Sequence, residues 1–289
     1  MNYLFHILVM LSVYSILCQS LNLSMGYAGL PSLCHAAFYG LGAYASTILV
    51  VKGNCPFVLS LLAAVAFVAA VGFVVSFPVT RCRGDFFVLA TLAFQMIVFV
   101  ILHNWTGVTG GAYGIAGIPK PSVFGFSFSS TASFAVLSGL LATLVGFIVF
   151  RLTHSPFGRT LQALREDDTA ALALGKHTTR FRRTAFTISA ALAAIAGTLF
   201  ACYSTYIDAT IFSADEAIFI FAALVIGGAG SFAGPTVGSL VLVLLPEALR
   251  FLRISDAIAA NTRQVLFGLL LILLMRFRPQ GIAGKHAFD

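Results

Sequence analysis

Long apolar runs, separated by short polar or glycine-rich stretches, make up almost the whole chain. The runs cover residues 3–24, 32–51, 57–80, 86–104, 131–152 and 184–206, then a glycine-broken stretch at 216–249 and a last run near 257–275. A membrane core about 30 Å thick needs about 20 apolar residues per helical crossing, so most runs are long enough to cross it. They are continuous rather than alternating, which favours helices over barrel strands. The pattern predicts an all-α, polytopic membrane protein with about 8–9 transmembrane helices, some of them broken by Gly and Pro.

Composition leaves no room for a sizeable soluble domain. Hydrophobic residues make up 59% of the 289 and charged residues only 9%, whereas soluble domains carry roughly 25% charged residues. We therefore expect one transmembrane domain over residues 1–289, with a polar cytoplasmic loop at 153–183. The net charge of +7 does not indicate nucleic-acid binding, because the basic residues lie in short loops beside apolar runs.

The basic residues also predict a topology. Arg81 with Arg83, the 153–183 loop, and a tail with Arg276, Arg278 and Lys285 are expected in the cytoplasm. The first run lacks the basic start and cleavage site of a secretory signal, so we expect it to be retained as a span. Counting back from Arg81 places the N-terminus outside. The basic tail lies on the same cytoplasmic side only if residues 216–249 cross the membrane twice, turning at GGAGSFAGP (227–235).

Three glycine-rich segments interrupt the helical pattern. GYAGLPSLCHAAFYGLGAY (26–44) contains Gly26, Tyr27 and Gly29, and it either lines a translocation path or packs helices closely. His35 is its one ionisable side chain, and a hydrogen bond to a neighbouring helix is favoured over a ligand contact. We also expect that half-helix N-termini at such breaks could attract a carboxylate of the solute.

The other two segments have open interpretations as well. TGVTGGAYGIAGIP (106–119), with Gly110 and Gly111, is either a flexible outer loop or a gate. VIGGAGSFAGPTVG (225–238) loosely echoes GYAG, as the corresponding halves of transporters with inverted repeats do. Its candidate path residues are Gly227, Gly228 and Gly230.

The longest polar run, residues 158–186, predicts a short amphipathic helix. Its apolar edge comprises Leu161, Leu164, Asp168, Ala171, Leu172 and Gly175. A solvated loop and a helix lying on lipid headgroups are the plainer interpretations. The acidic residues 166–168 disfavour headgroups, and an exposed edge of Ala170, Ala171, Ala173 and Gly175 favours insertion into a groove of a partner protein.

Several other functions are disfavoured by what the chain lacks. LGKHTT (174–179) has no glycine five residues before its Gly-Lys pair, so it is not a phosphate-binding loop and any nucleotide must bind to another chain. The carboxylates lie at expected span ends, which disfavours a proton- or sodium-coupled carrier. The five cysteines form no CxxC pair, so we expect no metal site, and no nucleophile–base pair indicates an enzyme.

Taken together, the motifs resemble those of one family. They are LNLSMGYAGLPSLCHAAFYGLGAY, RGDFFVLATLAF, NWTGVTGGAYGIAGIP, SPFGRTLQALREDDTAALALG, GGAGSFAGPTVGS and FRPQGIAG, in this order over nearly the whole chain. The chain resembles permease subunits of branched-chain amino-acid ABC importers, of the LivM-like branch. Family members usually begin with one further apolar span, and Cys34 stands where they commonly have Gly.

The resemblance implies an ATP-driven importer subunit that carries Leu/Ile/Val-type amino acids across the bacterial inner membrane. It implies four kinds of partner: a second homologous permease, two ATP-binding subunits that use the ATP, a periplasmic substrate-binding protein and the lipid membrane. It also implies that this chain itself binds no cofactor. Residues matching the family's ATPase-coupling motif are Arg165, Glu166, Asp168, Ala170, Ala171 and Gly175. Urea or short amides as cargo, or an ATP-independent channel for a small neutral solute, remain alternatives.

Overall fold

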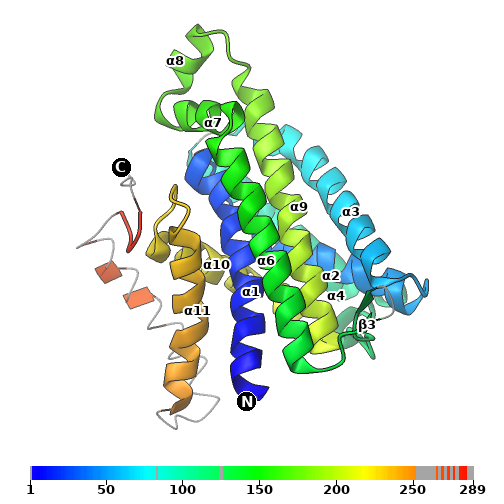
Figure 1. Ribbon diagram of the computed structural model, residues 1–289. Coiled ribbons are helices and arrows are strands. Elements are labelled where there is room, and N and C mark those ends of the chain that lie inside the picture. The colour runs from blue at the N-terminus through cyan, green and yellow to red at the C-terminus, as the bar shows by residue number, and fades with distance from the viewer. Residues whose placement is uncertain are drawn as a thin grey trace.

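The fold is a bundle of long helices whose two ends carry short elements (Figure 1). The computed structural model describes residues 2–82, 84–123, 126–251 and 280–284, and the single positions 265, 268, 269, 272, 273 and 276. Most of the run expected near 257–275, together with Arg83, Arg278 and Lys285, lies outside the described residues. The helices of the bundle are α1 (Asn2–Asn22), α2 (His35–Val51), α3 (Phe57–Val79), α4 (Asp85–Asn104), α6 (Thr131–His154), α9 (Thr178–Ser204), α10 (Ala214–Gly227) and α11 (Gly234–Phe251).

Five of these segments are long and apolar enough to cross a membrane. They are Tyr3–Tyr27, Phe57–Val79, Asp85–Asn104, Thr131–His154 and Thr178–Ser204, and His35–Val51 and Gly234–Glu247 are shorter apolar helices. The expected helical runs are therefore confirmed as far as residue 251. The first span is longer than expected, because α1 continues as a π-helix, η1 (Leu23–Tyr27).

Burial divides the helices into a centre and a periphery. α9 and α1 are central, because 72% and 50% of the residues in their most apolar stretches are buried. In α3, α4 and α6 only 22–28% of the corresponding residues are buried. The outer helices expose large apolar side chains such as Leu62, Ile97 and Leu140. A membrane protein presents such faces to lipid, so these three helices form the lipid-facing wall.

Small residues let the central helices approach closely. A methyl group added at Gly42 of α2 would lie 2.5 Å from the Ala194 Cα of α9, and one added at Gly197 would overlap the Tyr39 carbonyl oxygen. Packing through small residues is the usual way for helices to associate in lipid. Gly42 therefore lies inside a continuous α2 and serves packing. The break expected over 26–44 is confined to residues 28–34.

The two ends of the bundle differ in structure. At one end, α7 (Pro156–Glu166) and α8 (Asp168–Ala173) extend beyond the long helices, while the N-terminus lies at the opposite end (Figure 1). The predicted topology agrees with this placement. α10 and α11 are two separate helices joined at residues 228–233, where the turn of the expected double crossing was placed, and the crossing of the membrane by both stays a prediction.

The remaining short elements connect the long helices, and most of them lie at the end opposite α7. They are α5 (Thr106–Thr109), η2 (Gly111–Tyr113), β1 (Ile115–Ala116), β2 (Ser122–Val123), β3 (Phe126–Ser127), β4 (Tyr206–Ile207) and η3 (Ala209–Phe212). β1 pairs antiparallel with β4, and β2 pairs with β3. The β1–β4 pairing ties the segment after α4 to the segment after α9, which gives the glycine-rich stretch an ordered structure.

Candidate functional site

The polar run begins with a sharp turn between α6 and α7. Ser155 caps α7 by accepting a hydrogen bond from the Gly158 backbone nitrogen, and Pro156 occupies the first turn, where its missing N–H costs nothing. A methyl group at Gly158 would lie 2.5 Å from the Leu152 carbonyl oxygen. The expected change of direction after the fifth run is confirmed, and it lays α7 across the end of the bundle (Figure 1).

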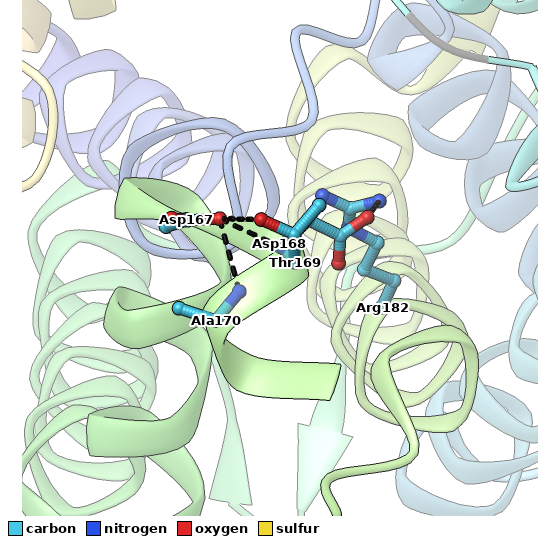
Figure 2. Close-up of polar contacts among 5 residues, drawn as sticks. All are labelled: Asp167, Asp168, Thr169, Ala170 and Arg182. Atoms are coloured by element: carbon cyan, nitrogen blue, oxygen red, sulfur yellow. Dashed lines mark hydrogen bonds and ion pairs between the residues drawn. The ribbon is translucent and has the colours of Figure 1, made fainter. Parts of the chain in front are cut away.

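The single amphipathic helix expected over this run is wrong, because the run forms two helices. The break is at Asp167, whose backbone is extended (φ −151°, ψ 107°). Its Oδ1 accepts hydrogen bonds from the Thr169 hydroxyl (2.6 Å), the Thr169 N–H (2.8 Å) and the Ala170 N–H (3.1 Å), as Figure 2 shows. These bonds, led by that from the Thr169 hydroxyl, lower the pKa of Asp167. Asp favours such caps over helix interiors, which explains the break.

An ion pair joins α8 to the start of α9. Asp168 Oδ2 lies 3.2 Å from Arg182 Nη1, and both side chains are about four-fifths buried (Figure 2). The next residue, Arg183, stacks over the Phe77 ring of α3, with 4.2 Å from its Cζ to the ring centroid. Thr178 to Arg183 are thus helical, so the last six residues of the loop expected over 153–183 belong to the start of α9.

The exposed surface of α8 differs from the one expected. Ala171 is buried, so it cannot contact a partner, which corrects its place on the exposed edge. Leu172 is 48% exposed and Leu174 78% exposed, whereas Leu161 and Leu164, which were expected on the same apolar edge as Leu172, are buried. Glu166, Ala170 and Gly175 are exposed. Gly175 has φ +73° and open space around it, so it ends α8 with a left-handed residue.

At the α7 end, the GYAG and GGAG segments lie against each other. Asn22 Oδ1 accepts from the Gly230 N–H (2.8 Å), and Asn22 Nδ2 donates to the Ser231 carbonyl oxygen (2.9 Å). A methyl group at Gly26 would overlap both Asn22 Oδ1 and the Gly230 nitrogen. We call the contact of residues 22–29 with 228–233 the glycine joint.

Gly227 and Gly228 lie beside the glycine joint and contact residues 282–284 near the end of the chain. A methyl group at Gly227 would lie 2.7 Å from the Gly238 nitrogen, so α10 and α11 cross in close contact there. The Ile282 N–H donates to the Ile226 carbonyl oxygen and the Ala283 N–H to that of Gly227, both at 2.9 Å. Residues 282–283 therefore lie at the α7 end, as the basic tail predicts.

Side chains of α4 cap the broken start of α2. Thr91 Oγ1 accepts from the Leu33 N–H (3.1 Å) and Gln95 Oε1 from the Ala37 N–H (2.6 Å), while Gln95 Nε2 donates to the Phe212 carbonyl oxygen (2.8 Å). The expected attraction of a solute carboxylate to helix N-termini needs free N–H groups at the helix start. Here the Leu33 and Ala37 N–H groups are bonded to side chains of α4.

His35 and Tyr27 are both buried in the bundle. His35 Nε2 lies 2.8 Å from Ser189 Oγ of α9, and Ser189 Oγ in turn donates to the Ser20 carbonyl oxygen. The favoured hydrogen bond to a neighbouring helix is thus present. Among the described residues, His35 Nδ1 has no hydrogen-bond partner. His35 therefore ties α2 to α9 in this conformation.

Gly110 and Gly111 lie at the opposite end of the bundle, away from the other candidate glycines. Both have positive φ (+77° and +60°), and a methyl group at Gly111 would lie 2.9 Å from the Thr106 side chain. Lys52 Nζ donates to the carbonyl oxygens of Gly107 and Val108 at 3.2 and 3.1 Å. The structure brings Gly26, Gly29, Gly227, Gly228 and Gly230 together, and keeps these two glycines apart from them.

Replacing Gln95 should destabilise the start of α2. Gln95→Leu removes the partner of the Phe212 carbonyl oxygen and leaves the Ala37 N–H with only its 3.1 Å hydrogen bond to the Cys34 carbonyl oxygen, and a buried group left unsatisfied costs about 1–3 kcal/mol. We expect a lower midpoint of thermal unfolding in detergent. Met96→Leu, at the exposed neighbouring position, is the control and should leave the midpoint unchanged. Equal midpoints for both variants would contradict the capping role.

Comparison with known proteins places these features in a family. The family model described as "Branched-chain amino acid transport system / permease component" matches residues 3–275. The chain belongs to this family. It is thus a transport permease and a multi-pass membrane protein, and its fold is the polytopic helical one predicted from the sequence.

Named relatives cover most of the permease. It is 37% identical to the high-affinity branched-chain amino acid transport system permease protein LivM of Escherichia coli (strain K12), over 93% of this chain and 67% of the relative. The LivM protein of Salmonella typhimurium is 36% identical over 96% of this chain and 69% of its own. The E. coli LivH permease is 27% identical over 95% and 92%. No solved structure gives a significant match.

Sequence reasoning missed three polar side chains that organise the permease. They are Asn22, Thr91 and Gln95, which hold the glycine joint and the start of α2. An available signal was the amide side chain within an apolar run, because a buried amide in lipid requires partners. The identity of those partners could not be read from the sequence.

Proposed function

We propose that this permease is the transmembrane subunit of an ATP-driven importer that moves branched-chain amino acids across the bacterial inner membrane. The printed names of the LivM and LivH relatives support both the cargo and the transport process. We propose further that residues 1–289 act as one transmembrane domain, with 153–183 in the cytoplasm. The basic residues around α7 and α8 support that orientation.

The observation that carries the proposal is the apolar surface of α8. Leu172 lies in α8 and Leu174 directly follows it, and both side chains are exposed on the part of the chain that extends beyond the long helices (Figure 1). A surface of this kind suits insertion into a groove of a soluble partner. The proposed occupant is an ATP-binding subunit, which carries the nucleotide site.

The proposed complex contains a second, homologous permease, two ATP-binding subunits and a periplasmic substrate-binding protein. The solute passes between the two permeases by alternating access, in which nucleotide binding favours one arrangement of α7 and α8. The glycine joint is the proposed inner gate, because it closes the α7 end through tight backbone contacts. Gly110 and Gly111 belong to the proposed outer gate.

Reconstitution tests this function directly. The complete complex, placed in proteoliposomes, should accumulate radiolabelled leucine, isoleucine and valine only when both ATP and the binding protein are supplied. Unlabelled urea and a short amide serve as competitors and should not reduce leucine uptake. Competition by urea would assign the alternative cargo, and equal flux without ATP would identify a channel and contradict the proposal.

A further inference from the structure

The Arg165 side chain points into the bundle rather than toward the exposed face of α8. Arg165 lies near the end of α7, and its Nη1 donates a 2.6 Å hydrogen bond to the Gly26 carbonyl oxygen. Its aliphatic stem packs on Gly29, where an added methyl group would lie 3.2 Å from Arg165 Cγ. One side chain from α7 thus contacts the first broken segment at two points.

The same guanidinium also contacts the second broken segment. A methyl group at Gly230 would lie 2.5 Å from Arg165 Nη1 and 3.2 Å from the Gly26 carbonyl oxygen. Gly29 and Gly230 both have positive φ (+66° and +79°), so each is a position where a side chain would be strained as well as crowded. The guanidinium therefore occupies a site formed by glycines of both segments.

The chemistry of this contact suits arginine. Gly26 lies in the π-helix that ends the first span. Its carbonyl group is at the C-terminal end of the helix, which is the negative end of the helix dipole. A cationic donor is favoured there, and a hydrogen bond from a charged group is roughly twice as strong as a neutral one. π-Helical turns are frequent at functional sites.

We propose that Arg165 is a positioning residue that fixes both halves of the glycine joint to α7, and that it does not contact the ATP-binding subunit. This inference rests on the proposed function. A displacement of α7 then moves the GYAG and GGAG segments together, because one guanidinium links all three. Asn22 keeps the two segments joined to each other, so Arg165 transmits the movement.

The ratio of solute uptake to ATP hydrolysis tests the role of Arg165. In the reconstituted complex, Arg165→Ala should lower ATP-driven uptake by about tenfold or more, the effect expected for a lost hydrogen bond from a charged group. ATP hydrolysis and the amount of copurified ATP-binding subunit should stay at the wild-type level. Arg165→Lys should be intermediate, because lysine keeps the charge and loses the planar donor pair. Arg159→Ala, an exposed arginine on the same helix, is the control and should keep the wild-type ratio.

A second variant keeps the arginine and removes its site. Gly230→Ala places a methyl group on the guanidinium position and should lower the same ratio. Loss of ATP-binding subunits from Arg165→Ala would place Arg165 in the docking surface, and an unchanged ratio in both variants would leave it no role in transmission. Either result overturns the inference. If the wild-type complex shows no ATP-driven uptake, the proposed function fails first, and this inference fails with it.

Discussion

Leu172→Glu combined with Leu174→Glu is expected to abolish ATP-driven uptake by releasing the ATP-binding subunits. The two side chains are 48% and 78% exposed on α8. Burial of a leucine side chain contributes about 1.5–3 kcal/mol, and a carboxylate placed in an apolar groove adds a desolvation cost. Loss of two such anchors should weaken binding by at least about a hundredfold, since each 1.4 kcal/mol is tenfold.

The measurement is copurification of the ATP-binding subunits with a tagged permease, followed by uptake in proteoliposomes. Gln162→Glu adds a carboxylate to exposed α7 without removing an apolar side chain, so it controls for charge alone and should retain both subunits. The double variant should still insert and fold, because neither leucine packs in the bundle. Retention of the subunits by the double variant would show that docking occurs elsewhere.

The corrected role of Ala171 matters for this design. Ala170, Ala171 and Ala173 all lie in α8, after the break at Asp167, so the break leaves their spacing unchanged. It changes the direction of α8 relative to α7, and in that direction the Ala171 side is buried against the protein. A bulky residue at Ala171 would therefore disturb the packing of α8, and its effect on uptake would say nothing about docking.

The apolar runs predicted the bundle well for a physical reason. In lipid, a long apolar run must satisfy its backbone hydrogen bonds internally and therefore forms a helix. The bounds of α3, α4 and α6 accordingly follow closely from hydropathy. The start of α9 was predicted six residues late, at residue 184 instead of 178. Hydropathy marks only the apolar part of the helix, whereas the helix itself continues through the basic residues Arg180 to Arg183. Arg183 packs on Phe77, and the Arg182 ion pair with Asp168 holds the first turn.

The candidate site was only partly predictable. Glycine clusters marked the GYAG and GGAG segments, because glycine is needed where backbones touch. That the two segments touch each other depends on tertiary packing, which a local pattern does not encode. The direction of Arg165 is a similar case: resemblance placed it in the coupling motif, whereas the structure shows its guanidinium inside the glycine joint.

Gly26→Ala should separate the two halves of the glycine joint. The added methyl group would overlap Asn22 Oδ1 and the Gly230 nitrogen, which are the two atoms of one hydrogen bond. The Gly230 nitrogen belongs to the backbone and cannot move aside alone, so the segments must part and both Asn22 hydrogen bonds are lost. We expect uptake to fall by at least about tenfold and stability to fall by about 1–3 kcal/mol, as for other overpacked sites.

Thermal unfolding in detergent and uptake in proteoliposomes measure these two effects. Gly107→Ala is the matched control, because a methyl group at Gly107 meets nothing within 4 Å and should change neither. The Asn22→Ala variant removes the same two hydrogen bonds without adding bulk, so it separates loss of bonding from steric displacement. If Gly26→Ala matches Gly107→Ala in both measurements, the close contact of the two segments is not required for transport. If Asn22→Ala reproduces the loss of uptake, the hydrogen-bonded alignment of the segments, rather than the space at Gly26, holds the gate.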